Sequence, residues 1–229
     1  EAAAQRLGCT AETPQRILSD SRFVFLGVKP QMLPALLDEL RPALLERTDR
    51  FLLVSMAAGV KTGTIRQALG FDCPVVRIMP NLPVALGKGV VLISPDDTVT
   101  EDELTALEEA LKPAGLLMRM PEDKLDAGSA VSGCGPAWVY QFIEALADGG
   151  VACGLPRAKA QEYAAQMVLG SAKLVLESGQ HPGALKDAVC SPGGSTIQGV
   201  RVLEEKGLRG AVMDAVIASY NKTKEMGKG

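Results

Sequence analysis

A glycine-rich bend that runs into a helical pattern is the part of this sequence best suited to bind an anion. The bend reads CSPGGST over residues 190–196, and the helical pattern continues to residue 206. Its two glycines allow a positive φ and close approach of a ligand to the backbone. The helix begins with unpaired N–H groups at the positive end of its dipole, which favours a carboxylate or phosphate. We expect Ser195 or Thr196 to be the N-cap, and the alternative is a capped helix start without a ligand.

Small residues, prolines and one asparagine stand where three predicted strands end, at residues 28–30, 57–59 and 79–83. Ligands bind at the carboxyl ends of strands in an open parallel sheet, and these segments form a rigid ledge for a flat ring. Lys29 offers a charge for phosphates, and Asn81, between two prolines in a stiff backbone, offers amide donors. The alternatives are an ordinary surface lysine at position 29 and a plain strand-to-helix turn at residues 57–59.

Few residues are suited to acid, base or metal chemistry. Cys134 lies in a second glycine-rich bend with no histidine near it in sequence, and that bend is expected to be a turn between helices. The single histidine, His181, is expected to mark a helix entry, and no metal-ligand cluster appears. Glu122 and Asp126 are expected to favour a helix dipole rather than to form a carboxylate pair. This inventory fits hydride transfer from a reduced nicotinamide, in which the protein binds, orients and excludes water.

Alternating strands and helices must position the ledge. The continuous apolar character of the strands predicts a parallel sheet covered on both faces. Residues 1–7 are interpreted as the end of a helix whose beginning is missing, so the chain looks truncated. The pattern predicts strands over 23–28, 51–56, 75–79, 90–94 and 116–120, and helices over 13–20, 31–45, 62–69 and 100–111, the last opened by a capping box.

The sequence after residue 122 is helical throughout, which predicts two domains, residues 1–122 and 123–229. Several of its helices are apolar on more than one face, and we expect the segment 156–177 to be largely buried between subunits. Helices are predicted over 124–132, 136–153, 156–177, 182–189, 195–206 and 208–226.

Composition narrows the function classes. The 229 residues are 47% hydrophobic and 22% charged with a net charge of −3, which is typical of a soluble globular protein. Basic residues are scattered, so neither nucleic acid nor an acidic membrane surface is an expected partner. Five cysteines without a C-x-x-C pair predict free thiols in a reducing compartment. With no apolar run of membrane-spanning length, we expect a cytoplasmic protein.

Five segments, in order, resemble the pyrroline-5-carboxylate reductase family. The densest is LKDAVCSPGGSTI over 185–197, followed by VRVLE over 200–204, and the others are VKP, SMAAGV, MPNLP and SGCGPA, which begin at residues 28, 55, 79 and 132. The resemblance implies reduction of 1-pyrroline-5-carboxylate to L-proline by NADPH or NADH, the final step of proline biosynthesis. It also implies a Rossmann-like α/β dinucleotide-binding domain, N-terminally incomplete, followed by an all-α domain that forms homodimers and larger rings.

The resemblance also implies roles for particular residues. The dinucleotide contacts, with Asn81 added from the ledge, are expected at Gly27, Val28, Lys29, Pro30, Met56, Ala57, Ala58 and Asn81. The substrate carboxylate is expected at Ser191, Gly193, Gly194, Ser195 and Thr196. Among these, the Thr196 hydroxyl is expected to face the ring nitrogen as the catalytic contact, and no metal is expected.

One departure from the family pattern concerns the N-terminus. Family members normally begin with a strand and a G-x-G-x-x-G turn that holds the pyrophosphate, and no such turn precedes Phe23. A protein truly lacking it is expected to bind the cofactor poorly. Two alternatives therefore stand beside the reductase. They are another two-domain NAD(P)-dependent dehydrogenase with a helical second domain, for which Lys186 is the nearest lysine base, and a non-catalytic oligomeric scaffold or regulator.

Overall fold

The computed structural model describes residues 2–227, and the chain folds as two compact units. The first unit comprises Glu1–Gly133 and Ser219–Gly229, and the second comprises Cys134–Ala218. No helix among the described residues is both long and apolar enough to cross a membrane. Within the same residues, histidine, cysteine, aspartate and glutamate side chains form no group of three or more that is suited to a metal ion.

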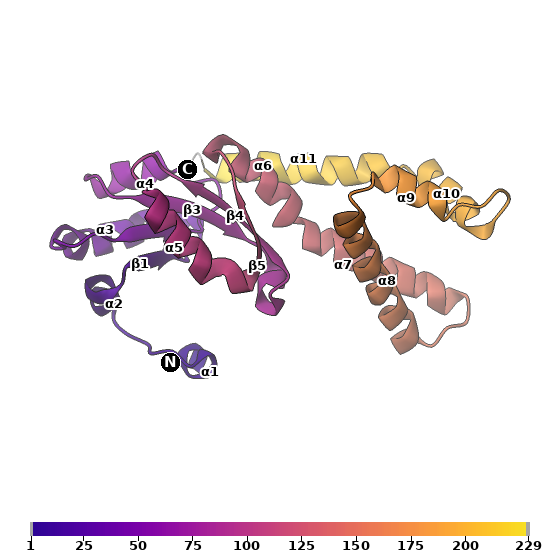
Figure 1. Cartoon of the computed structure of the whole chain (residues 1–229), viewed down its shortest axis with the longest axis horizontal. Helices are drawn as coiled ribbons and strands as arrows, with labels where there is room; N and C mark the ends of the chain where they lie inside the picture. Colours follow the sequence, from indigo (N-terminus) through magenta and orange to yellow (C-terminus); the bar gives the residue numbers. More distant parts are fainter. Residues whose placement is uncertain (1, 228–229) are drawn as a thin grey trace. The chain divides into compact units, whose positions relative to one another are not determined.

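A five-stranded sheet with strand order β1-β2-β3-β4-β5 forms the centre of the first unit (Figure 1). Neighbouring strands run parallel at every pairing except that of β3 with β4. The strands are β1 (Phe23–Leu26), β2 (Leu52–Ser55), β3 (Val75–Pro80), β4 (Gly89–Pro95) and β5 (Gly115–Arg119). The predicted strands are therefore confirmed, with bounds that differ by a few residues.

The antiparallel pairing of β3 with β4 corrects the expectation of a wholly parallel sheet. A parallel connection requires a crossover of a dozen residues or more, usually through a helix. Between Pro80 and Gly89 the chain forms only the short 3₁₀ helix η2 (Leu82–Leu86). So short a segment cannot return the chain to the opposite edge of the sheet, and β4 reverses direction instead.

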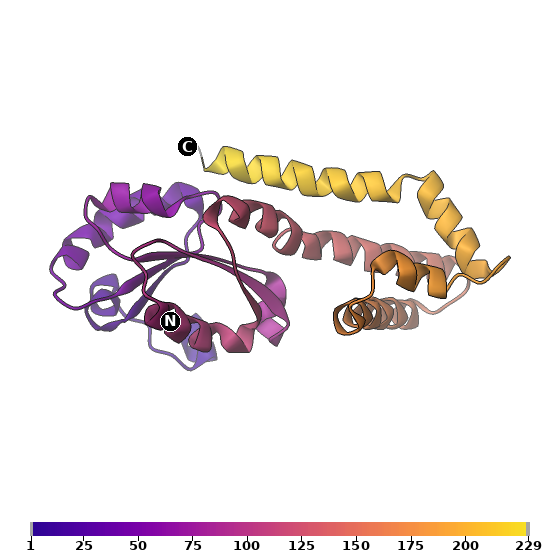
Figure 2. The same ribbon diagram turned by 45° about the horizontal axis from the view of Figure 1, so that its top comes forward.

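Helices cover both faces of this sheet, as Figures 1 and 2 show. Leucines of α2, α3 and α4 pack with Val24, Leu53 and Val75 in one apolar cluster. Leu104 and Leu107 of α5 pack with Leu52, Val54 and Val76 in the other. The helices are α1 (Ala2–Leu7), α2 (Pro14–Asp20), α3 (Leu33–Leu45), α4 (Thr62–Leu69), α5 (Glu101–Leu111) and α6 (Glu122–Ser132), with 3₁₀ turns η1 (Pro30–Met32) and η3 (Lys112–Ala114).

Strand β2 explains why both layers form. All four of its residues are buried, and successive side chains point to opposite faces of the sheet. Leu53 therefore belongs to one cluster and Leu52 to the other. Three successive residues of this strand, 52–54, are apolar without alternation, which is the pattern that predicted a sheet covered on both faces.

The N-terminus of α5 carries the capping box expected at Thr100. The Thr100 hydroxyl accepts a hydrogen bond from the Glu103 N–H, and the Glu103 carboxylate accepts one from the Thr100 N–H. A hydrogen bond from Arg50 lowers the pKa of the Glu103 carboxyl to about 2. The carboxylate therefore stays ionised at neutral pH and fixes the start of α5.

The second unit is helical throughout. Its helices are α7 (Gly135–Ala152), α8 (Arg157–Ser178), α9 (Pro182–Ala188), α10 (Ser195–Glu205) and α11 (Leu208–Met226), whose last turns belong to the first unit. Helices α7 and α8 pack closely, because Gly150 brings its backbone against Ala160 and the alanines at positions 147, 160 and 164 are buried. Large apolar side chains remain exposed along α7, α8 and α11, among them Tyr140, Tyr163, Leu176 and Met213. This exposure is typical of a subunit that buries these faces against another chain.

Candidate active site

The ends of β1 and β2 lie side by side and bring two parts of the ledge together. Leu26 pairs with Ser55 in the parallel register, and the Met56 N–H donates to the Leu26 carbonyl at 3.2 Å. A Cβ at Gly27 would lie 3.2 Å from the Met56 methyl group, so the two residues are in contact. A side chain at position 27 would therefore displace Met56.

After β1 the chain turns outward through Val28 into η1. Gly27 and Lys29 are exposed, and Lys29 forms no ion pair with any side chain that the structure describes. Lys29 is the N-cap of η1 with extended backbone angles, and Pro30 is the first residue of that 3₁₀ helix. The ammonium group of Lys29 is thus available to an anion at this edge of the sheet.

After β2 the chain turns tightly over residues 57–60. The Ala57 N–H donates to Ser55 Oγ at 3.3 Å, and the Val60 N–H donates to the Ala57 carbonyl at 3.4 Å. Gly59 has φ of 76°, and a Cβ there would lie 2.6 Å from the Thr223 carbonyl oxygen. Only glycine fits this position, because the end of α11 packs directly on the turn.

Asn81, at the third strand end of the ledge, has partners that the sequence did not indicate. Its side chain is fixed, as expected, but its partners are protein backbone: Nδ2 donates to the Ser132 carbonyl at 2.9 Å, and Oδ1 accepts from the Val90 N–H at 2.9 Å. The amide thus ties the end of β3 to the start of β4 and the last residue of α6. Nδ2 carries a second hydrogen, which is the donor that a cofactor contact of Asn81 would use. This contact stays a prediction.

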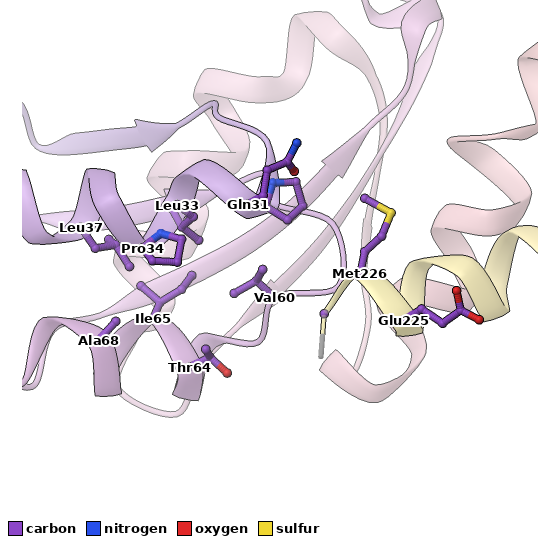
Figure 3. A pocket seen from close by; sticks show the side chains of 12 residues that line it. Gln31, Leu33, Pro34, Leu37, Val60, Thr64, Ile65, Ala68, Glu225 and Met226 are labelled. Atoms are coloured by element: carbon purple, nitrogen blue, oxygen red, sulfur yellow. The ribbon is translucent and has the colours of Figure 1, made fainter. Parts of the chain in front are cut away.

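A groove of about 490 Å³ adjoins the ledge between α3, α4 and the end of α11 (Figure 3). It shares Pro30 with the ledge, and Met226 reaches toward it from α11. Apolar residues such as Leu33, Leu37 and Ile65 dominate its lining, and Glu225 is the one charged residue among those that the structure places there. The lining offers no cation for a phosphate.

A buried ion cluster joins β3 to α6, and the sequence analysis did not predict it. Arg77 of β3 is 1% exposed, and its Nη1 and Nη2 reach Glu122 Oε1 at 3.4 Å and Asp126 Oδ1 at 3.0 Å. We call Arg77, Glu122 and Asp126 the Arg77 cluster. The two acidic residues were interpreted as helix-dipole partners only. The missed signal was an arginine within the apolar run VVRIM of β3, because a buried guanidinium requires carboxylate partners.

The glycine-rich bend of the second unit is an uncapped helix start. Gly193 has φ of 70°, and the Gly194 N–H donates to the Ser191 carbonyl at 3.0 Å. The N-cap of α10 is Gly194 and has no side-chain hydrogen bond, so the expected cap at Ser195 or Thr196 is wrong. Those two residues instead begin the helix itself. A glycine N-cap leaves the first N–H groups without a side-chain acceptor, because glycine has no side chain to supply one.

The bend has the properties of an anion site. Ser195 and Thr196 are exposed, and the first turn of α10 contains no acidic residue. No carboxylate in the first turn of α10 therefore offsets the positive end of the helix dipole. The predicted substrate residues, Ser191, Gly193, Gly194, Ser195 and Thr196, lie together in this one bend, although the role of each stays a prediction.

Other candidates for acid–base chemistry have structural roles. A hydrogen bond to Asp187 raises the pKa of Lys186, which keeps the ammonium protonated and makes it a poor base. His181 Nδ1 accepts the Gly183 N–H at 3.0 Å at the start of α9, as expected for a helix-entry residue. Burial raises the pKa of the Cys73 thiol to about 11, so this thiol is a poor nucleophile.

Known proteins resemble the chain over most of its length. Residues 122–226 match the family model described as pyrroline-5-carboxylate reductase dimerisation. The chain is 42% identical over 218 residues to pyrroline-5-carboxylate reductase of Escherichia coli, which covers 95% of this chain and 80% of that protein. It is 41% identical to pyrroline-5-carboxylate reductase 3 of Xenopus laevis, covering 96% and 79% of the two chains. The crystal structure of Plasmodium falciparum pyrroline carboxylate reductase with NADP bound superposes with a TM-score of 0.88 at 31% identity, covering 96% and 82%.

Proposed function

The chain belongs to the pyrroline-5-carboxylate reductase family, and we propose that its first unit holds the cofactor while the glycine-rich bend holds the substrate. The reaction is the reduction of 1-pyrroline-5-carboxylate to L-proline with a reduced nicotinamide cofactor, NADPH or NADH. It is the final step of proline biosynthesis. The observation that carries the proposed division is the contrast between a small-residue ledge in one unit and an uncapped helix start in the other.

The ledge fits a dinucleotide in shape and charge. The cofactor residues we propose at its first two strand ends are Gly27, Val28, Lys29, Pro30, Met56, Ala57 and Ala58, with Asn81 at the third. Because Gly27 has no side chain, none projects beside the Met56 methyl group, and we expect a flat ring to fit between the two strand ends. The exposed Lys29 suits a phosphate, and the small side chains of Ala57 and Ala58 allow the backbone to approach the ligand closely.

The bend fits the substrate carboxylate. The N–H groups of the first turn of α10 and the positive end of its dipole stabilise a carboxylate, and each charge-assisted hydrogen bond contributes about 1.5 to 3 kcal/mol. We assign the Thr196 hydroxyl to the ring nitrogen of the substrate. A cyclic imine is already electrophilic, and protonation of its nitrogen makes it more so, hence the site needs no buried base. The cofactor, when bound, supplies the hydride for the imine carbon.

Thr196→Ala is expected to lower kcat/KM by about tenfold, because one hydroxyl contact contributes about 0.5 to 1.5 kcal/mol and 1.4 kcal/mol is a factor of ten. The fold should be unchanged, since Thr196 is exposed. The assay follows the absorbance of the reduced cofactor in the complete protein. Ser195→Ala is the control in the same turn: it keeps the backbone N–H that we assign to the carboxylate and should change kcat/KM by less than about threefold. Wild-type kinetics for Thr196→Ala would contradict the catalytic assignment.

The chain is also a homo-oligomer through its helical unit, as the match to a dimerisation family indicates. We propose that dimers assemble further into a ring and that α8 lies in the dimer interface, because Tyr163, Met167 and Leu176 of this helix are exposed in the single chain. A stable monomer at micromolar concentration in sedimentation would contradict the interface.

A cytoplasmic location is proposed from the free thiols of all five cysteines.

The functional division into residues 1–122 and 123–229 remains a proposal. The family match begins at residue 122, which supports it. By packing, however, α6 belongs with the sheet, because Gly128 of α6 lies against Leu92 of β4. Helix α6 therefore belongs to the dimerisation family in sequence and to the first unit in structure.

The alternative of a dehydrogenase with a lysine base is less well supported. An alcohol substrate requires a base to accept its proton. Lys186, the nearest lysine to the bend, is held protonated by Asp187. Imine reduction has no such requirement.

A further inference from the structure

Helix α4 is capped by a carboxylate from another helix. Its N-cap, Lys61, forms no side-chain cap, and the N–H of Thr62, the first residue of α4, donates to Glu122 Oε1 at 2.7 Å. Glu122 begins α6, sixty residues further along the chain. A carboxylate at this position satisfies an otherwise unpaired N–H and favours the positive end of the α4 dipole.

The Arg77 cluster fixes the position of this carboxylate. The same oxygen, Glu122 Oε1, accepts from Thr62 and lies 3.4 Å from Arg77 Nη1. Arg77 is 1% exposed and is held from its other side by Asp126 at 3.0 Å. A guanidinium is planar and rigid, and burial confines its rotamers, so Glu122 has little freedom to move.

The segment between Ser55 and Thr62 contains the turn of the ledge. The Ala57 N–H is fixed by Ser55 Oγ at one end, and the Thr62 N–H is fixed by Glu122 at the other. Between them, Gly59 lies against the last turns of α11. Ala57 is 1% exposed and cannot shift without repacking the sheet. Glu122 is therefore the contact that ties this turn to the start of α6.

We propose that Glu122 is a positioning residue for the reaction: through the Thr62 N–H it holds residues 57–61 in the conformation that binds the cofactor. This inference rests on the proposed cofactor role of Ala57 and Ala58. Asp126 accepts a hydrogen bond from Arg77, whereas the Thr62 N–H donates its hydrogen bond to Glu122. Asparagine at position 126 keeps an acceptor oxygen for Arg77, so Asp126→Asn is expected to lower stability and to leave Glu122 in place.

Glu122→Ala tests the proposal in the complete protein, with Asp126→Asn as the matched control. Glu122→Ala is expected to raise the Kd for NADPH, measured by cofactor fluorescence, and the KM for NADPH by about tenfold. The KM for 1-pyrroline-5-carboxylate should stay within about twofold. Glu122→Gln keeps an acceptor oxygen and should restore most of the affinity. Asp126→Asn should lower the melting temperature and leave the Kd for NADPH within about twofold of wild type. Equal changes of the Kd in Glu122→Ala and Asp126→Asn would overturn the proposal.

Thr62→Pro removes the donor instead of the acceptor. Proline is tolerated at a first helical position, and Lys61, with φ of −80° and ψ of 155°, already has the conformation that precedes proline. This variant should reproduce the Kd of Glu122→Ala, and the double variant should add nothing further. Additive effects would overturn the proposal.

Ala58→Leu separates this proposal from the cofactor assignment itself. If Ala58→Leu weakens NADPH binding and neither Glu122→Ala nor Thr62→Pro does so, the positioning role is wrong while the cofactor site stands. If none of the three variants weakens NADPH binding, both are wrong.

Discussion

Gly194→Val is expected to raise the KM for 1-pyrroline-5-carboxylate by about a hundredfold, with the KM for the reduced cofactor within about twofold of wild type. A Cβ at position 194 would overlap Ser191 Oγ, which must rotate away, and would lie 3.2 Å from the Ser191 carbonyl oxygen, so the bend must open by a few tenths of an ångström. A β-branched side chain also restricts the N-cap. Opening the bend separates the amides that we assign to the substrate carboxylate, and two charge-assisted hydrogen bonds to that carboxylate are then weakened.

Gly199→Ala is the matched control for this variant. It adds a Cβ in the same helix, where no neighbouring atom lies within 4 Å, and alanine favours helix over glycine. Its kinetics should therefore equal those of wild type. If Gly194→Val left the substrate KM unchanged, the bend would be a helix start without a ligand, and the substrate assignment would fail.

Arg77→Met is expected to lower the free energy of unfolding of the first unit by about 2 to 4 kcal/mol, because removal of one partner leaves buried charges uncompensated. The side chains of Glu122 and Asp126 are only 28% and 17% exposed, so water restores little of the lost attraction. Methionine fills much of the volume of arginine, which limits the cavity contribution. Urea unfolding followed by far-ultraviolet circular dichroism measures the change.

Two further variants show whether lost charge pairing or lost packing causes the stability loss of Arg77→Met. Adding Glu122→Gln and Asp126→Asn to Arg77→Met removes the unpaired charges and should recover more than about half of the loss. Arg209→Met removes an exposed ion pair with Glu204 and should change stability by less than about 0.5 kcal/mol. Equal losses for Arg77→Met and the triple variant would show that packing, and not charge, accounts for the effect.

The elements around the bend and ledge were predictable because their signals are local. The capping box at Thr100, the glycine stop after α4 and the prolines at helix starts depend on neighbours within a few residues. The strands were predictable because each is a short apolar run. The family motifs, which are continuous in sequence, identified the candidate site for the same reason.

Features that depend on distant partners were not predictable. The backbone partners of Asn81 are Ser132 and Val90, one of them more than fifty residues away, and the sequence indicated neither of them. The N-cap of α10 moved to Gly194 because the Ser191 carbonyl accepts the Gly194 N–H and closes the bend one residue earlier. Glu122 appeared to be a helix-dipole residue of its own helix, and its main partner is the start of another. Nothing within a local window distinguishes these cases.

The most direct test of the central claim, that the glycine-rich bend holds the substrate carboxylate, compares 1-pyrroline-5-carboxylate with 1-pyrroline, the same cyclic imine without the carboxylate. The complete wild-type protein should reduce 1-pyrroline with a kcat/KM at least about a hundredfold lower, since charge-assisted bonds are lost. In Gly194→Val this preference should fall to about tenfold or less. Equal kcat/KM for both imines in wild type, or an undiminished preference in Gly194→Val, would contradict the claim.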